Sequence, residues 1–140
     1  MTRMIETFRG VAHPWLCDAF GHLNTRNYVG MFDDASFHLF SALGASPIEL
    51  LREHKGWADV KAELEFKDEV PLGHLVVVRT GVVKLGRTSL AYRHEMRGAD
   101  DDRLHATMQT VTVHFDLKTR KSIPLPDVLR ASAERHLLED

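Results

Sequence analysis

The longest apolar pattern in the chain runs from residue 28 to residue 43. Tyr28, Phe32, Ala35, Leu39 and Leu43 recur at steps of four and three, which is the spacing of one helical face. Further residues widen this face until little polar surface remains, namely Val29, Met31, Ser36, Phe37 and Phe40. The pattern therefore predicts a long α-helix that is buried on most of its surface.

Both ends of this helix carry signals of their own. Asn24 or Thr25 can cap the N-terminus, because a short side-chain oxygen accepts a hydrogen bond from an unpaired N–H group of the first turn. At the other end Leu43 is followed by Gly44, which can adopt the left-handed conformation of a C-terminal cap. We expect the helix to start near residue 25 and to stop at residue 43.

The segment before the helix is predicted to be a loop. Pro14 and Gly21 punctuate it, and neither residue suits the interior of a regular element. Asp18 and His22 lie in this loop, so we expect both side chains just upstream of a helix N-terminus.

Alternation of apolar and polar residues predicts strands elsewhere. It is clearest from Ala58 to Phe66, where apolar side chains face one way and charged ones the other, as in a half-solvated strand. The remaining strands are predicted over residues 4–13, 74–83, 88–96 and 104–115, with turns at 71–73 and 85–87 and a polar loop at 98–102. Short helices are predicted at 46–52 and 127–138.

This order is a strand, a long helix, and then four strands joined by short connections. Such strands must be antiparallel, because parallel neighbours need a crossover of roughly a dozen residues or more. The sequence predicts an α+β fold in which one curved antiparallel sheet wraps around a buried helix. With 140 residues, 44% of them hydrophobic, residues 1–140 are expected to form a single domain.

Composition excludes several classes of function. Eighteen basic and twenty acidic residues give a net charge of -2, so binding to nucleic acid or to a membrane surface has no general electrostatic support. We find no segment of signal-peptide type and no apolar run near the ~18 residues of a membrane span. Cys17 is the single cysteine, which fits a reducing compartment. These features predict a cytoplasmic protein.

The loop and the helix together resemble a known family. Asp18-Ala19-Phe20-Gly21-His22-Leu23-Asn24, followed by Asn27-Tyr28 and the long helix, is similar to the Asp-x-x-Gly-His-x-Asn signature of hotdog-fold acyl-CoA thioesterases. The ten-residue step from Asp18 to Tyr28 looks like that of the 4-hydroxybenzoyl-CoA thioesterase branch. The resemblance implies a hotdog domain that hydrolyses a small or medium acyl- or aroyl-CoA to the free acid and CoA, as a homodimer or homotetramer. In the related loop of acyl-ACP thioesterases an asparagine stands where this chain has Phe20, which favours a mechanism centred on Asp18.

The chemistry of thioester hydrolysis gives these residues candidate roles. Asp18 can attack the thioester as a nucleophile or activate water as a general base. His22 can orient Asp18 or the water, or it can hold the loop by a hydrogen bond, and both roles stay open. The N–H groups near Asn24 and Thr25, together with the helix dipole, can polarise the thioester carbonyl. Cys17 fits a small buried hydrophobe better than a nucleophile.

Coenzyme A would need local cations for its phosphates. The turn Lys84-Leu85-Gly86-Arg87-Thr88-Ser89 is the best candidate, and in the resembling family this turn looks like a CoA-contacting region. Its CoA-binding residues would be Lys84, Arg87, Thr88 and Ser89. CoA would enter only as part of the substrate, so we expect no separate cofactor.

A metal site is not expected either, because the histidines on the predicted strands lack a tight ligand spacing. Two alternatives remain open. One is a hydratase or dehydratase on the same fold, and the other is a non-catalytic acyl-CoA-binding module. The acyl group itself is not encoded in any pattern of the sequence.

Overall fold

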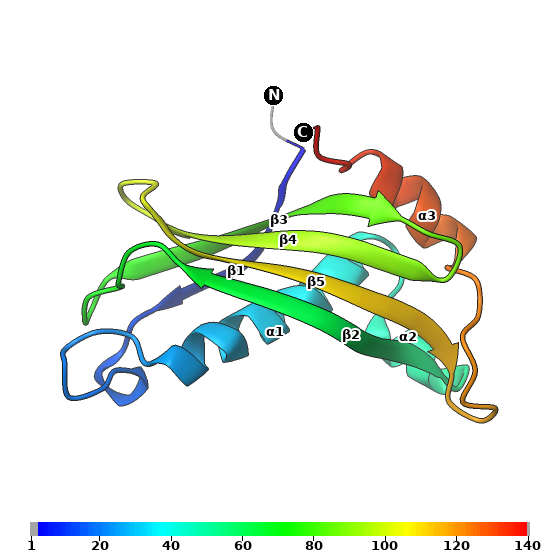
Figure 1. Cartoon of the computed structure of the whole chain (residues 1–140), viewed down its shortest axis with the longest axis horizontal. Helices are drawn as coiled ribbons and strands as arrows, with labels where there is room; N and C mark the ends of the chain where they lie inside the picture. Colours follow the sequence, from blue (N-terminus) through cyan, green and yellow to red (C-terminus); the bar gives the residue numbers. More distant parts are fainter. Residues whose placement is uncertain (1–2, 140) are drawn as a thin grey trace.

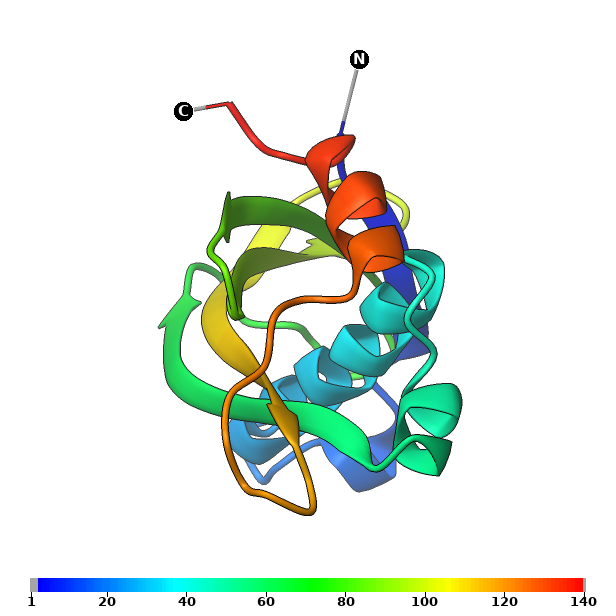
Figure 2. The ribbon, with the colours of Figure 1, turned by 90° about the vertical axis from the view of Figure 1, so that its right-hand side faces the viewer.

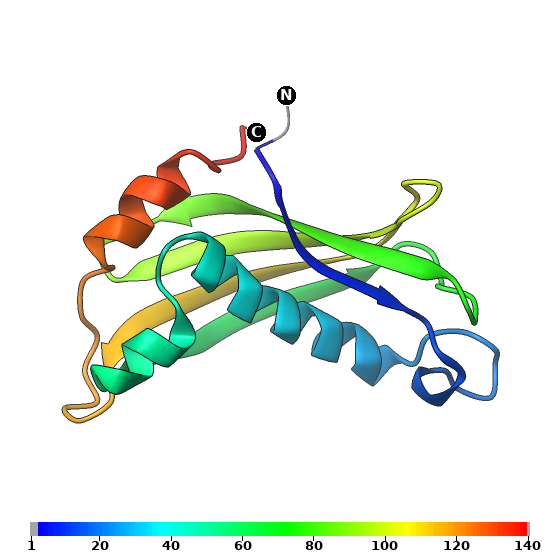
Figure 3. The same ribbon diagram turned by 180° about the vertical axis from the view of Figure 1, so that it is seen from behind.

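A five-stranded antiparallel sheet curves around one long helix (Figures 1 and 2), which confirms the predicted α+β hotdog fold. The computed structural model describes residues 3–139. Its strands are β1 (Ile5–Val11), β2 (Lys55–Phe66), β3 (Leu75–Leu85), β4 (Ser89–Gly98) and β5 (Leu104–Asp116). Its helices are the 3-10 turn η1 (Pro14–Leu16), α1 (Thr25–Ala42), α2 (Pro47–Arg52) and α3 (Asp127–Glu134). Seen from behind, α1 lies along the concave face of the sheet (Figure 3).

The strand order differs from a simple meander at one point. The sheet reads β1-β3-β4-β5-β2, so β2 pairs with β5 and not with the strand that follows it in the chain. Residues 67–74 therefore connect β2, at one edge, to β3 near the other edge. Alternation along a strand shows which side chains share a face, but it does not name the neighbouring strand. In the described part of the chain the second edge of β2 has no strand partner.

The two ends of α1 follow the prediction. Asn24 is the N-cap, and its Oδ1 accepts a hydrogen bond from the Arg26 N–H at 3.1 Å. Gly44 follows the C-cap residue Leu43 with a φ of 85°, which is the left-handed conformation that favours glycine. The local capping signals were sufficient to locate both ends.

The extent to which α1 is buried was predicted wrongly. The helix buries one face against the sheet, through Tyr28, Met31, Phe32, Ala35, Ser36, Leu39 and Phe40. On the opposite face Val29 is 44% exposed and Phe37 is 57% exposed. The sheet covers α1 from one side only, so these two apolar side chains remain uncovered in the single chain, with the exposed Asp33 between them along the helix.

Strand β2 also departs from its predicted alternation. Val60 was expected to face the core, but it is 62% exposed. Phe66 keeps its predicted face, because its ring packs edge-on against the buried Tyr28, although it remains 53% exposed. A bulge between Asp59 and Lys61 shifts the register with β5, and a bulge adds a residue that breaks the two-residue period. A similar shift between Glu6 and Phe8 occurs in β1.

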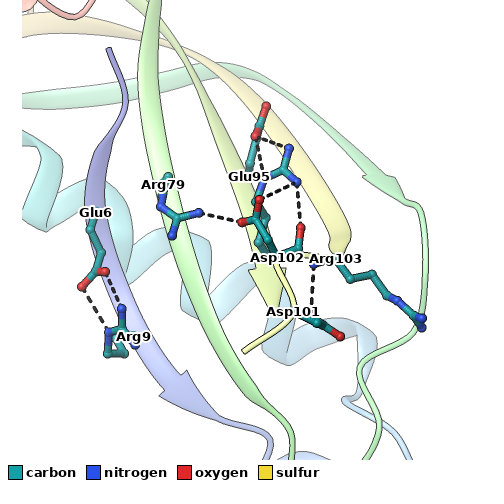
Figure 4. Close-up of polar contacts among 8 residues, drawn as sticks. Glu6, Arg9, Arg79, Glu95, Asp101, Asp102 and Arg103 are labelled. Atoms are coloured by element: carbon teal, nitrogen blue, oxygen red, sulfur yellow. Dashed lines mark hydrogen bonds and ion pairs between the residues drawn. The ribbon is translucent and has the colours of Figure 1, made fainter. Parts of the chain in front are cut away.

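Ion pairs cover the outer face of the sheet (Figure 4). Arg79 on β3 contacts Asp102 in the β4–β5 loop at 3.0 Å, and Arg97 on β4 contacts Glu95 at 3.0 Å. Each of these pairs is partly exposed, so each contributes at most about 1 kcal/mol. The Arg79–Asp102 pair, together with the hydrogen bond from Arg97 to the Asp102 carbonyl, holds the β4–β5 loop against β3 and β4.

Candidate active site

The loop ahead of α1 has a defined structure. Cys17 and Leu23 form an isolated antiparallel bridge, and within it the Asp18 N–H donates to the His22 carbonyl at 3.1 Å. Gly21 closes the turn with a φ of 86°. The Leu23 N–H also donates to the Val70 carbonyl at 2.8 Å, which ties the loop to the segment between β2 and β3. The backbone therefore fixes where the Asp18 side chain leaves the loop.

The Asp18 carboxylate is anchored at one oxygen. Its Oδ1 accepts a hydrogen bond from the Phe20 N–H at 2.9 Å, as in an Asx turn. Within residues 3–139 no hydrogen bond reaches its Oδ2, and the residue is partly exposed. An oriented carboxylate with one free oxygen can act as a nucleophile or as a base.

The imidazole of His22 has partners other than Asp18. Its Nε2 lies 2.9 Å from a carboxylate oxygen of Glu69, and its Nδ1 lies 3.4 Å from the Leu23 carbonyl oxygen. Glu69 comes from the segment between β2 and β3, so this pair joins the loop to that segment. Sequence reasoning missed Glu69, which no motif marks.

The N-terminus of α1 offers fewer free donors than its position suggests. The Asn24 N–H donates to the Leu16 carbonyl at 2.9 Å, and the Asn24 side chain caps the helix. For the Thr25 N–H, the structure of residues 3–139 shows no acceptor. Of the two predicted donors, Thr25 is the one with an N–H available to a ligand.

Cys17 and Tyr28 both support the loop. Burial and the nearby Asp18 carboxylate raise the pKa of the Cys17 thiol, which disfavours the thiolate that a nucleophile needs. Its Sγ lies 3.6 Å from the Ala12 carbonyl oxygen. The Tyr28 hydroxyl accepts a hydrogen bond from the Val70 N–H at 3.3 Å. Both side chains belong to the packing around the site.

The predicted CoA-binding turn lies at the other end of the sheet (Figure 1). Lys84, Arg87, Thr88 and Ser89 connect β3 to β4 near the start of β2, whereas the Asp18 loop lies near the end of β2. The Leu125 N–H donates to the Arg87 carbonyl at 3.0 Å, so the C-terminal segment packs against this turn. A single chain does not bring the turn and Asp18 together.

A pocket of about 490 Å³ lies between the second half of α1, α2 and the start of β2. The aromatic rings of Phe37, Phe40 and Trp57 line it, together with the carboxylates of Asp33 and Asp59. Its inner wall carries the hydroxyls of Ser36 and Tyr92. No motif in the sequence locates this pocket, because its residues come from α1, α2, β2, β4 and the segment after β5 and share no spacing.

The described residues contain no cluster of potential ligands that could hold a metal ion. His105 and His114 are buried singly, and each has a backbone carbonyl as hydrogen-bond partner. No helix between residues 3 and 139 is long and apolar enough to cross a membrane.

Comparison with protein families decides the class of this protein. Residues 12–132 match the model of the thioesterase-like superfamily. The chain belongs to the thioesterase-like superfamily. Membership confirms the interpretation of the sequence as a thioester hydrolase. Comparison with curated protein sequences gives no match.

Solved structures share the fold of this thioesterase-like chain. A Staphylococcus aureus protein solved in complex with CoA is 16% identical, with a TM-score of 0.86 over 100% of this chain and 90% of that one. The 1,4-dihydroxy-2-naphthoyl-CoA thioesterase of Synechocystis is 19% identical, with a TM-score of 0.79 over 90% and 94%. A gentisyl-coenzyme A thioesterase is 23% identical, with a TM-score of 0.79 over 89% and 97%. At these identities the likeness concerns the fold.

Proposed function

We propose that this protein hydrolyses acyl-CoA thioesters through Asp18. The observation that carries the proposal is the position of Asp18, whose carboxylate has one free oxygen just ahead of the N-terminus of α1. Family membership and the solved CoA-thioester hydrolases of the same fold support it. The substrate is a small or medium acyl- or aroyl-CoA.

Two routes use this carboxylate. As a nucleophile, the free oxygen of Asp18 attacks the carbonyl carbon, CoA leaves as a thiolate that takes a proton, and water then cleaves the mixed anhydride. As a general base, Asp18 takes a proton from the water that attacks. In both routes negative charge grows on the carbonyl oxygen, and in our proposal the Thr25 N–H and the dipole of α1 stabilise it. Neither route requires a cofactor besides the CoA of the substrate.

In the proposed mechanism His22 supports the loop that carries Asp18. Its contact with Glu69 favours the role of holding the loop closed, and so positioning Asp18, over direct proton transfer. The alternative, in which His22 orients the attacking water, requires the ring to leave Glu69 in the substrate complex.

We further propose that the site is completed by a second copy of the chain, in a homodimer or homotetramer. The open edge of β2 is a surface that another strand can pair with, and the exposed Val29 and Phe37 of α1 lie uncovered on the helix. Antiparallel pairing of β2 with its copy puts the end of β2 near Asp18 beside the start of the partner strand. The turn with Lys84 and Arg87 lies at that start, so in our proposal the partner chain binds the CoA phosphates.

The test is thiol release from a panel of acyl-CoA thioesters with short, long, aromatic, hydroxylated and cationic acyl groups. Release from at least one of them by the wild-type protein is expected. Water addition to an enoyl-CoA without thiol release would instead indicate a hydratase on this fold. Tight binding of the thioesters without either reaction would indicate a binding module.

A further inference from the structure

The pocket behind α1 has walls made of aromatic rings. Phe40 and Trp57 stack with their ring centroids 4.6 Å apart and their planes 3° from parallel. Phe37, which is 57% exposed, forms the outer wall. The rings come from α1 and from the start of β2, so the space between them is fixed by two packed elements.

Two carboxylates stand at the same pocket. Asp33 on α1 and Asp59 on β2 both line it, and within residues 3–139 neither takes part in an ion pair or a hydrogen bond. Burial raises the pKa of Asp33, and the neighbouring charges of Asp59 and Asp34 raise it further. Lys55 is the cation of this pocket, and its Nζ lies 3.4 Å from a carboxylate oxygen of Glu53. Two negative charges therefore face the pocket without a partner of their own.

The hydroxyls of the inner wall are already occupied. The Ser36 Oγ lies 2.9 Å from the His94 Nε2, accepts from the Tyr92 hydroxyl at 2.9 Å, and lies 3.2 Å from the Phe32 carbonyl oxygen. A ligand gains little from these groups, because binding to them would break existing hydrogen bonds. The Trp57 Nε1 is buried without a hydrogen-bond partner among the described residues, so it offers a ligand one neutral N–H donor. Recognition of charge in this pocket is left to Asp33 and Asp59.

Aromatic faces combined with carboxylates are the chemistry that binds organic cations. The negative face of an aromatic ring attracts an ammonium group, and the attraction grows where water is excluded. A neutral acyl group of the same shape would fill the space, but it would leave the two carboxylates in mutual repulsion. The charges of the pocket therefore discriminate between acyl groups of equal size.

The position of the pocket fits a role in the reaction. It lies at the start of β2, and antiparallel pairing of two β2 strands places this start beside the end of the partner strand, near the partner's Asp18. An acyl group attached to the thioester at one Asp18 would then extend into the pocket of the other chain.

We propose that this pocket selects acyl groups that carry a positive charge, as an amine or a quaternary ammonium, and that Asp33 and Asp59 determine this selectivity. The inference rests on the proposed thioesterase function and on the paired chains.

The test compares two thioesters that differ in one atom. 4-(Trimethylammonio)butyryl-CoA and 5,5-dimethylhexanoyl-CoA have the same shape, and the charge lies far enough from the carbonyl to leave its reactivity similar. We expect the wild-type protein to cleave the cationic thioester with a kcat/KM at least about tenfold higher. An equal or higher kcat/KM for the neutral thioester, or for 4-hydroxybenzoyl-CoA, would overturn the inference.

Variants then assign the selectivity to residues. Asp33→Asn and Asp59→Asn should each reduce the ratio of kcat/KM for the cationic thioester to kcat/KM for the neutral one, and the double variant should bring this ratio to about one. Asp34→Asn is the matched control, because Asp34 neighbours Asp33 on α1 without lining the pocket. A preference that survives in the double variant would contradict the assignment, as would a change that only accompanies loss of the dimer in light scattering.

The two proposals fail in different ways. If no thioester of the whole panel releases thiol, the proposed function fails, and calorimetric binding of the cationic and neutral thioesters then decides the inference. If other thioesters release thiol and these two do not, the inference alone is overturned. Tighter binding of the cationic thioester that weakens in the double variant supports the pocket assignment. Equal binding of both overturns it.

Discussion

At the scale of single residues, the most unusual group outside the loop is His94. It lies at the centre of a buried chain of hydrogen bonds, in which its Nδ1 lies 2.6 Å from the Thr80 Oγ1 and its Nε2 lies 2.9 Å from the Ser36 Oγ. Burial lowers the pKa of His94 from 6.5 to about 3. The folded protein therefore keeps this imidazole neutral, and its two ring nitrogens hold β3 and α1 together across the core.

This histidine makes stability depend on pH. Between about pH 6.5 and pH 3 the unfolded chain binds a proton at His94 that the folded chain does not. The contribution of His94 to the free energy of unfolding is therefore fully present above pH 6.5 and is lost as the pH falls toward 3. One proton corresponds to a slope of about 1.4 kcal/mol per pH unit. Urea unfolding between pH 4 and pH 7 should show a shallower slope for His94→Gln than for the wild type. The pKa of His114 is also lowered, chiefly by burial. His114 therefore contributes to the dependence of stability on pH in the wild type and in His94→Gln alike. Equal slopes would contradict the account.

At the scale of elements, α1 decides where the candidate site forms. Its first turn begins directly after the Asp18 loop, and the Asn24 cap fixes that beginning. A helix that started one turn later would leave Thr25 in the loop and its N–H aimed elsewhere. The cap thus links the stability of the helix to the geometry of the site.

Replacement of the cap should test this link. Asn24→Ala removes the side-chain acceptor of the Arg26 N–H and should lower the free energy of unfolding by about 1 kcal/mol. Asn24→Asp keeps an acceptor and serves as the control. Both are measured by urea unfolding, and an Asn24→Ala midpoint equal to that of the wild type would contradict the assigned cap.

The elements also show how far sequence reasoning reaches. Local sequence patterns predict the helix, its caps and the strands, and they also predict the position of Asp18 ahead of α1. The pairing of β2 with β5, the bulge after Asp59 and the contact of His22 with Glu69 depend on residues far apart in the chain, and no local spacing records them. The polar residues of the pocket could not be placed for the same reason, since Asp33 and Asp59 line one pocket only after β2 has folded beside α1.

At the scale of the whole molecule, the single chain exposes an unpaired strand edge and apolar side chains. In residues 3–139 one edge of β2 is open, Val29 and Phe37 of α1 are uncovered, and Asp18 and the turn with Arg87 lie at opposite ends of the sheet. Pairing of two chains through β2 would cover the open edge and the exposed side chains of α1. It would also bring Asp18 of one chain close to the turn with Arg87 of the other. The oligomer is therefore part of the proposed site and not an addition to it.

A charge on this edge should separate the chains. Val60→Lys places an ammonium on the exposed surface of β2, and we expect a shift from dimer to monomer in sedimentation together with loss of thioester hydrolysis. Val128→Lys is the control, because Val128 on α3 is 64% exposed, close to the 62% of Val60. A Val60→Lys variant that remains an active dimer would contradict pairing through β2.

In the proposed mechanism Asp18 carries the hydrolysis. The rate of thiol release by Asp18→Asn, compared with the wild type on the best thioester of the panel, tests this role. The carboxamide keeps an oxygen for the Phe20 N–H but removes the charge needed for attack or proton abstraction. We expect a loss of about 10²- to 10⁴-fold with an unchanged circular dichroism spectrum, while Asp34→Asn retains the wild-type rate. A near-normal rate in Asp18→Asn would contradict the account.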